Sequence, residues 1–307
     1  GKIHDGVAIH LANACLALGK TPVQVAQMVA GGETDISSLE WQGTQEVTKK
    51  AREMVQDCLD KIKARRAERE ALLEELPVTQ TPWLYVICAT GNIHEDAVQG
   101  RLAASQGADV IAVIRSTGQS LLDFVPHGLT TEGFGGTYAT QANFRLMREA
   151  LDEESRKLGR YVRLVNYCSG LCMPEIAYMG AVERLDMMLN DAMYGILFRD
   201  INMERTFVDQ NFSRMINAYA GIIINTGEDN YLTTVEAFDA GPQVLASQFM
   251  NYHFAKKAGL KDEQIGLGHA FEIDPGIQDS LSYELAMALL VRQLFPACPI
   301  KYMPPTV

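Results

Sequence analysis

The sequence predicts an α/β protein built as a (β/α)8 TIM-type barrel with a helical N-terminal arm. Residues 1–80 have the apolar spacing of helices, whereas short apolar runs alternate with amphipathic helical segments from residue 82 onward. Apolar strands that alternate with helices are typical of a parallel sheet covered by helices. The number of these strand–helix units suits a barrel better than an open sheet. We therefore divide the chain into an arm, 1–80, and a barrel domain, 81–307.

The arm is predicted to contain helices over 5–20, 21–32 and 44–76. The second helix has clear boundary signals, because TPVQVAQMVAGG supplies a threonine N-cap, a proline at the first helical position and a terminal glycine pair. The second half of the long helix, KARRAEREALLEEL at 63–76, is mostly charged. We expect a solvated face there, and a helix that docks a partner is the alternative.

The barrel domain is predicted to contain seven strands. They are expected at 83–90, 108–115, 161–169, 194–199, 220–227, 265–272 and 299–303. No eighth strand is visible, so either residues outside this chain close the barrel or one strand is misassigned. The chain begins with Gly1 rather than methionine, and we expect either a fragment or a processed start.

Composition excludes several classes of protein. A net charge of −11 argues against a nucleic-acid backbone or an anionic membrane as the main partner. Six cysteines are too few for a disulfide scaffold, and the pair Cys168 and Cys172 has no third ligand nearby, so we expect packing cysteines and no metal site. No signal peptide and no apolar run of membrane-spanning length is visible, which favours a cytoplasmic protein.

Polar residues gather at the predicted carboxyl ends of the strands, where barrel enzymes carry their active sites. In strand order they are Thr90, Asn92, His94 and Glu95; Arg115, Ser116, Thr117, Gln119 and Ser120; Asn166, Tyr167 and Ser169; Arg199 and Asp200, with Tyr194 at the strand start; Asn225, Thr226, Glu228 and Asp229; His269 and Glu272; Lys301 and Tyr302. Charged groups at successive strand ends cost desolvation free energy unless they are paired or bind a ligand.

The chemistry of this set indicates a bound dianion. Two arginines, a lysine and several hydroxyl groups suit a phosphate, whereas Glu228 and Asp229 suit an amine or a ring nitrogen. Each residue alone also has a structural interpretation: an ion pair for Arg115, a turn for Ser169, packing for Tyr194. For His94, Asp229, His269 and Lys301 the structural alternatives are a core, loop or solvent-exposed position. Their common place at one end of the predicted barrel favours a site. The glycines of GFGGTY, 133–138, do not match a dinucleotide-binding fingerprint.

Four stretches resemble the α subunits of the lysine 5,6-aminomutase family. They are residues 91–153, YCSGLCMPEIAYMGAVERLDMMLNDAMYGILFRDINMERT at 167–206, INTGEDNYLTT at 224–234, and LGHAFEIDP together with KYMPPT between 267 and 306. The resemblance runs from about residue 82 to the end of the chain. The large subunit of D-ornithine 4,5-aminomutase has a closely similar barrel and is the alternative within this group.

The resemblance implies two cofactors and a partner. The barrel is expected to bind pyridoxal 5'-phosphate at its C-terminal face. A separate cobalamin-binding β subunit is expected to carry adenosylcobalamin and the lysine that forms the aldimine with pyridoxal phosphate, in an α2β2 heterotetramer. The implied reaction is a radical 1,2-amino shift, an isomerisation that moves the terminal amino group of lysine from C6 to C5.

The resemblance also implies roles for individual residues. The expected contacts of the cofactor phosphate are Arg115, Ser120, Ser169 and Arg199. Tyr194 matches a tyrosine near the cofactor, and Asp229 and Lys301 match an interacting acid–lysine pair in the cofactor and substrate region.

Two other classes of function stay open at this point. Another phosphate-binding barrel enzyme would need its own Schiff-base lysine, and Lys301 is the only lysine at a predicted strand end. A non-catalytic interaction subunit would have no reason to keep so many polar strand ends.

Overall fold

The structure is a computed structural model that describes residues 6–113, 140–168, 173–190, 203–226, 241–269 and 280–302. The chain divides into two compact units, Gly1–Lys63 and Ala64–Val307. The long helix α3 (Thr44–Glu75) begins in the first unit and ends in the second.

The first unit contains α1 (Val7–Leu18), α2 (Pro22–Ala30) and the beginning of α3. The predicted cap of α2 is confirmed: the Thr21 hydroxyl accepts a hydrogen bond from the backbone N–H of Gln24, and the Gln24 side chain accepts one from the N–H of Thr21. Ala14, Cys15 and Val25 form the small apolar core between the first two helices. The predicted helices of the arm are therefore confirmed.

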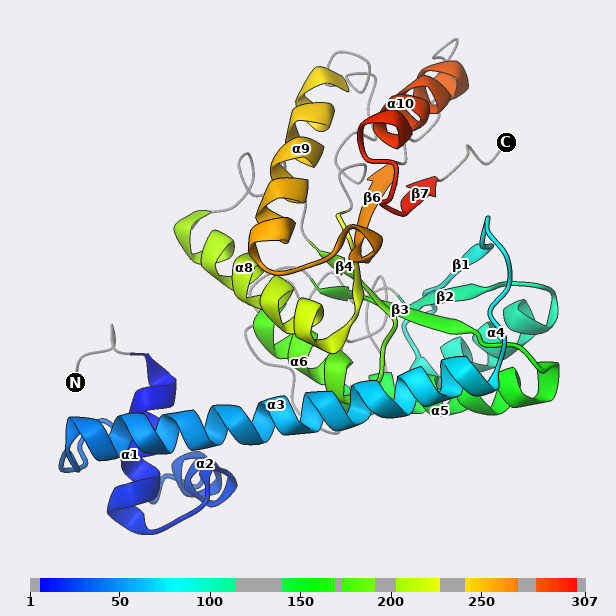
Figure 1. The fold of residues 1–307 in the computed structure, drawn as a ribbon. Helices are drawn as coiled ribbons and strands as arrows, with labels where there is room; N and C mark the ends of the chain where they lie inside the picture. The colour runs from blue at the N-terminus through cyan, green and yellow to red at the C-terminus, as the bar shows by residue number, and fades with distance from the viewer. Residues whose placement is uncertain are drawn as a thin grey trace. The chain divides into compact units, whose positions relative to one another are not determined.

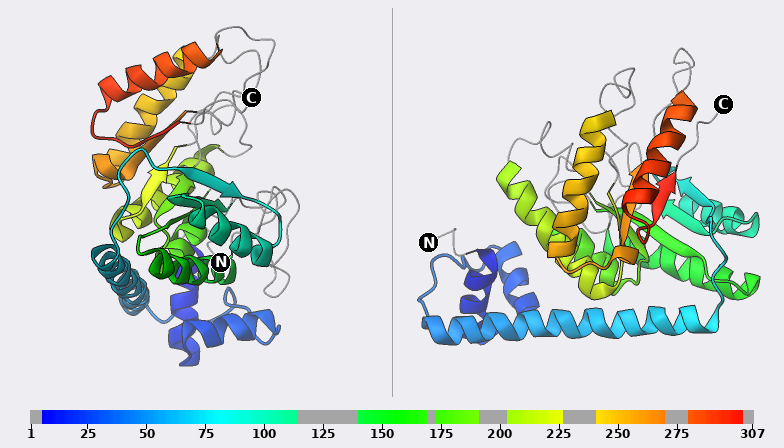
Figure 2. Two further views of the ribbon diagram at one scale, coloured as in Figure 1. Left: turned by 90° about the vertical axis from the view of Figure 1, so that its right-hand side faces the viewer. Right: turned by 45° about the horizontal axis from the view of Figure 1, so that its top comes forward.

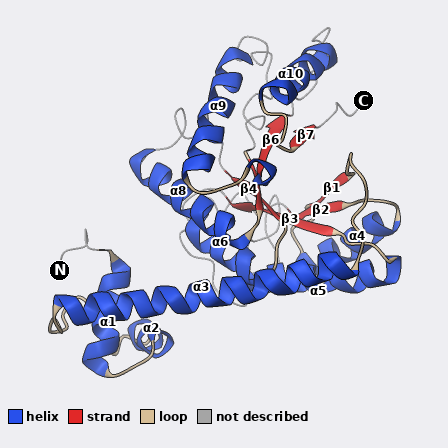
Figure 3. Ribbon diagram, in the orientation of Figure 1, coloured by secondary structure: helices blue, strands red, loops and turns tan. Residues whose placement is uncertain are grey.

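The second unit is a seven-stranded parallel sheet whose strands follow one another in chain order (Figures 1 and 3). The strands are β1 (Tyr85–Cys88), β2 (Val110–Val113), β3 (Arg163–Cys168), β4 (Met187–Asn190), β5 (Ile223–Asn225), β6 (Ile265–His269) and β7 (Ile300–Tyr302). The helices between them are α4 (Ile93–Ser105), α5 (Gln141–Leu158), α6 (Met173–Val182), α8 (Met203–Ala220), α9 (Gly241–Lys257) and α10 (Ser280–Leu294). Each strand pairs in parallel with the next, which a crossover helix between strands makes possible.

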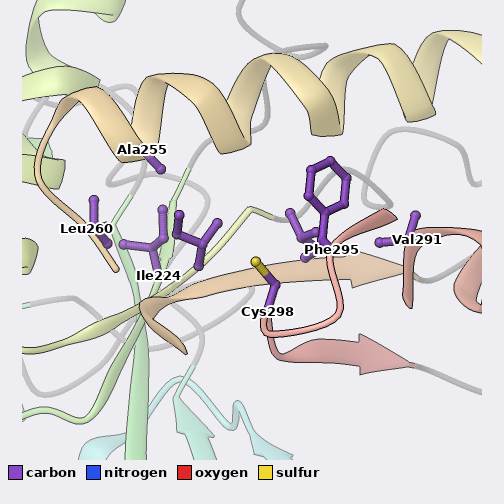
Figure 4. Close-up of a cluster of buried hydrophobic side chains, with 8 residues drawn as sticks. Ile224, Ala255, Leu260, Val291, Phe295 and Cys298 are labelled. Carbon is purple, nitrogen blue, oxygen red and sulfur yellow. The ribbon is translucent and has the colours of Figure 1, made fainter. Parts of the chain in front are cut away.

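The sheet has an outer face covered by helices and an inner face lined by strand residues. On the outer face, Ile224 packs with Ala255 of α9, with Val291 of α10 and with Phe295 directly after α10 (Figure 4), and Leu267 belongs to the same cluster. Figure 2 shows these two helices from two further sides. The inner face has its own cluster, Val110, Ala112, Val165 and Met187, against which Trp83, Tyr85 and Ile223 pack. Both faces of the central strands are buried, which explains why the strands are mainly apolar before their carboxyl ends.

The fourth strand lies earlier in the chain than the sequence predicted. We expected it at 194–199, but the strand that pairs with β3 and β5 is β4, Met187–Asn190. Residues 194–199 lie outside the described residues. Methionine is unbranched and favours helices, so MMLN carries a weak strand signal beside the aromatic and branched residues of YGILFR.

The second half of α3 packs against the barrel unit rather than presenting only a solvated face. Arg69 is 5% exposed, and its guanidinium donates hydrogen bonds to the carbonyl oxygens of Leu185 (2.5 Å), Ala220 (2.8 Å) and Gly221 (3.0 Å). The expectation of a solvated helix is wrong for this side, although Glu68, Glu70, Glu74 and Glu75 are exposed as expected.

Candidate functional site

The inner face near the carboxyl ends of the strands forms the candidate site. Pairing places Tyr167 of β3, Leu189 of β4, Asn225 of β5 and Gly266 of β6 in one row. Side chains alternate along a strand, so these residues share the inner face with Val165, Met187 and Ile223, which form the row below. We call the upper row the mouth row and the lower row the apolar floor. The floor excludes water beneath the site, and the mouth row supplies its first polar groups.

Among the residues to which the family resemblance gave a role, Lys301 is the one that lies within the described part of the chain. Its neighbour Ile300 packs with the outer cluster, so alternation turns Lys301 toward the inner face. Its ammonium nitrogen lies 4.8 Å from the centroid of the Tyr85 ring, within reach of a cation–π interaction. The structure therefore places a half-buried positive charge on the inner face, at the height where β6 and β7 pair through Gly268 and His269.

The other residues with a role implied by the resemblance lie outside the described residues. They are Arg115, Ser120, Ser169, Tyr194, Arg199 and Asp229. Their places in the chain nevertheless follow described strand ends. Ser169 comes directly after β3, and Tyr194 and Arg199 come between the end of β4 and the start of α8. Their roles stay predictions.

Asn225 is the one asparagine at the described strand ends whose side-chain amide has no hydrogen-bond partner among the described residues. It is 1% exposed, and among the described residues neither its amide nitrogen nor its amide oxygen has a hydrogen-bond partner. Its backbone is well held, because the N–H of Thr226 donates to the carbonyl of Gly266 at 3.0 Å. An unpaired buried amide costs free energy, so this side chain marks a place where a ligand group is expected.

Two of the four polar residues predicted at the end of the first strand, Thr90 and Asn92, have structural partners, and one of these partners is Asp96. Asp96 is fully buried and accepts hydrogen bonds from the backbone N–H and the hydroxyl of Thr90. The Asn92 side chain caps α4 by accepting a hydrogen bond from the N–H of His94. His94 and Glu95 are exposed on the first turn of that helix. Thr90, Asn92 and Asp96 therefore stabilise the β1–α4 turn and the start of the helix and are not part of the mouth row.

A buried polar cluster supports the end of β4 from the outer side. The guanidinium of Arg214, which is 0% exposed, donates a hydrogen bond from Nε to the side-chain oxygen of Asn190 at 2.9 Å and from Nη2 to that of Asn251 at 2.5 Å. The Asn190 amide also donates to the hydroxyl of Ser213. Asn190 precedes the segment that carries Tyr194 and Arg199, so the cluster fixes the starting point of that segment. Sequence reasoning missed it, because nothing in the spacing links α8 and α9 to a strand end.

The cysteines behave as packing residues wherever they are described. The Cys168 thiol is buried and donates a hydrogen bond to the carbonyl of Met173, whereas Cys172 lies outside the described residues. Burial raises the pKa of the Cys88 and Cys298 thiols to about 11, which keeps them neutral. No group of three residues suited to hold a metal ion occurs within 6–113 or the other described ranges.

Within the part of the chain that the structure describes, we also find no helix long and apolar enough to cross a membrane.

The fold and the site together define a class of protein. A parallel sheet wound with outer helices, an apolar floor and polar side chains at the carboxyl ends of the strands are the features of a TIM-barrel enzyme domain. The comparison with known protein families agrees. The family model described as the D-lysine 5,6-aminomutase TIM-barrel domain of the alpha subunit matches residues 1–307.

The chain belongs to this family, which confirms the resemblance and the fold class predicted from the sequence. It is 62% identical over 301 residues to the lysine 5,6-aminomutase alpha subunit of Acetoanaerobium sticklandii, and that alignment covers 98% of this chain and 58% of the relative. The alpha subunit from Fusobacterium nucleatum is 58% identical over 307 residues, covering 100% of this chain and 59% of the relative. The chain thus spans somewhat more than half the length of these curated relatives.

A more distant relative carries a different name. The D-ornithine 4,5-aminomutase subunit beta of Acetoanaerobium sticklandii is 34% identical over 223 residues, which is 72% of this chain and 29% of that relative.

Proposed function

We propose that this chain is the cofactor-binding barrel of a lysine 5,6-aminomutase, an isomerase that moves the terminal amino group of lysine from C6 to C5. The observation that carries the proposal is the 62% identity, along 98% of the chain, to an alpha subunit of that name. The identity to the ornithine enzyme is only 34%, which favours lysine over ornithine as the substrate.

The described residues fit pyridoxal phosphate as the group bound at the mouth row. The inner face offers the ammonium of Lys301, the unpaired amide of Asn225 and an apolar floor on which a flat ring can lie. Arg115, Ser120, Ser169 and Arg199 are the residues proposed to hold the phosphate. Arginine suits this task because its planar guanidinium donates two parallel hydrogen bonds to a phosphate.

The remaining proposed residues orient the reacting molecule. Tyr194 would cover one side of the cofactor ring, and Asp229 and Lys301 would place a negative and a positive charge beside a zwitterionic amino acid. When bound, pyridoxal phosphate supplies the carbonyl group that takes up the substrate amine, and adenosylcobalamin supplies the radical. The chain's own contribution is to position these groups and to exclude water above the floor.

A partner subunit follows from this proposal. The names of the relatives as alpha subunits support a second subunit, which we propose to be the cobalamin-binding β subunit that supplies the cofactor lysine. An α2β2 heterotetramer in the cytoplasm is the assembly and location that we propose.

Turnover tests the proposal. The full-length chain, co-expressed with its cobalamin-binding partner, would be given pyridoxal phosphate and adenosylcobalamin in darkness and without oxygen. We expect lysine to be converted to 2,5-diaminohexanoate and ornithine to be left unchanged. Conversion of ornithine alone would show that the substrate is ornithine and that the enzyme is an ornithine aminomutase. Absence of either conversion, with both cofactors bound, would contradict the proposed reaction.

A further inference from the structure

We infer that Asn225 is a direct hydrogen-bond partner of the ligand bound at the barrel mouth, a role that goes beyond the phosphate contacts proposed above and rests on the proposed function. The observation is an amide that is 1% exposed and lacks any partner among the described residues. Buried amides in native proteins are nearly always hydrogen-bonded, because an unpaired one has lost its water without compensation.

The direction of the side chain follows from the packing of its neighbours. Ile224 belongs to the outer cluster with α9 and α10, whereas Ile223 packs with the inner cluster. Alternation along β5 therefore turns Asn225 inward, at the carboxyl end of the strand. This is the end at which barrel enzymes bind their substrates.

The neighbours of Asn225 on the paired strands explain why no group among the described residues hydrogen-bonds to its amide. The residue paired with Asn225 on β4 is Leu189, which has no polar side-chain atom. The residue paired with it on β6 is Gly266, which has no side chain. The neighbouring Thr226 is committed to β6 through its backbone N–H and its hydroxyl. The amide is thus held on a paired strand, and the described part of the chain leaves it available to a molecule that enters from the mouth.

The chemistry of a carboxamide limits what that molecule offers. The amide nitrogen donates and the amide oxygen accepts, so the best match is a group with an anionic oxygen beside an N–H donor. A phosphate dianion offers acceptors only and suits arginine better. The polar edge of the pyridoxal ring and the head group of an α-amino acid both offer the required pair, so the two sources share one chemistry.

Asn217 provides a matched control for the test. It is 0% exposed and its amide also lacks a partner among the described residues, but it lies in the last turn of α8, at the opposite end of the sheet. A leucine at either position replaces the unpaired amide by an apolar group of similar shape.

The experiment compares Asn225→Leu and Asn217→Leu in the full-length protein with its partner. Without cofactor, we expect both variants to melt at the wild-type temperature or above it, because each loses an unsatisfied amide. We expect only Asn225→Leu to weaken ligand binding, by about tenfold or more. An Asn225→Ala variant repeats the binding measurement without added bulk.

The two sources of the ligand group give different results. A rise in the dissociation constant of pyridoxal phosphate, followed by its absorbance, assigns the contact to the cofactor. An unchanged cofactor affinity with a raised KM for lysine assigns it to the substrate. The inference is overturned if both Asn225 variants bind cofactor and substrate like wild type, or if Asn225→Leu lowers the melting temperature of the cofactor-free protein as a structural residue would. Wild-type protein that neither binds the cofactor nor turns over lysine would instead contradict the proposed function. In that case the melting temperatures of the two leucine variants would still show whether Asn225 has a purely structural role.

Discussion

Gly266 of β6 pairs with Asn225 of β5 and leaves no room for a side chain between the two strands. A Cβ atom at this position would stand 2.6 Å from the carbonyl oxygen of Ile224, a main-chain atom that cannot rotate away. At Gly180 in α6, by contrast, the nearest atom to an added Cβ would be the terminal methyl of Met188, which is the flexible end of a side chain. An added Cβ would therefore be about equally close to a neighbouring atom at both glycines, but only the neighbour of Gly180 can move away.

We predict that Gly266→Ala destabilises the fold by about 1–3 kcal/mol, the usual cost of overpacking, because β5 and β6 must separate. Gly180→Ala is expected to cost less, since Met188 can change rotamer and alanine favours a helix. Urea unfolding of both variants measures the difference. Equal stabilities of the two variants would show that β5 and β6 are not as closely packed as described.

The buried thiols predict a pH dependence of stability. Burial raises the pKa values of Cys88 and Cys298 from 9.0 to about 11, with Asp96 and Asp262 adding to the effect. The folded protein therefore holds these protons more tightly than the unfolded chain. The resulting stabilisation is complete below about pH 9 and is lost as the pH rises toward about 11.

Unfolding free energies at about pH 8 and about pH 10.5 test this linkage. We expect the double variant Cys88→Ala, Cys298→Ala to lose less stability between the two pH values than the wild type loses. Tyrosines and lysines also titrate in this range, and the double variant keeps all of them. An identical loss in both proteins would exclude the two thiols as the source.

At the scale of elements, the end of α3 joins the N-terminal side of the sheet to the helices around it. Arg69 donates to the carbonyls of Leu185, before β4, and of Ala220, the last residue of α8. Arg65 donates to the carbonyl of Val182, the last residue of α6. The last carbonyls of a helix lack intrahelical partners and carry partial negative charge, so a buried guanidinium stabilises them. The hydrogen bonds of Arg65 and Arg69 at this end of the barrel therefore stabilise the fold, whereas the candidate site lies at the other end of the strands.

We predict that Arg69→Met lowers the free energy of unfolding by about 2–4 kcal/mol, because it leaves buried carbonyls without their donor. Its control is Glu70→Gln, which removes only the exposed ion pair with Arg66 and is expected to cost at most about 1 kcal/mol. Thermal and urea unfolding of the two variants check the difference. A loss of stability for Arg69→Met no larger than that for Glu70→Gln would contradict the stabilising role of the Arg69 hydrogen bonds.

Sequence patterns predicted some of these elements better than others. The cap at Thr21 was readable because its partners lie three residues apart. The buried role of Arg69 was not, because its partners lie more than a hundred residues away. In the same way, Asn190 and Asn225 look alike in the sequence, yet the first faces α8 and binds Arg214 while the second faces inward. Only the strand register shows which face of the sheet each asparagine occupies. The sequence pattern predicted the strand that contains Asn190 at the wrong residues.

At the scale of the whole molecule, the alternation of strands and helices was sufficient to predict the barrel class. The described residues form seven strands of it, as many as the sequence indicated. The identity of the bound group was not derivable from spacing. Polar strand ends indicate a dianion, and membership of the lysine 5,6-aminomutase family is what suggests pyridoxal phosphate.

The affinity for pyridoxal phosphate tests the central claim most directly. The double variant Arg115→Ala, Arg199→Ala would be titrated with the cofactor in the full-length complex, beside the charge-matched control Arg101→Ala, Arg145→Ala, whose side chains form ion pairs on α4 and α5. Because each charge-assisted hydrogen bond contributes about 1.5–3 kcal/mol, we predict a loss of about a hundredfold or more for the first variant and none for the control. Cofactor affinity that is unchanged in the first variant would contradict a phosphate site at the mouth of this barrel.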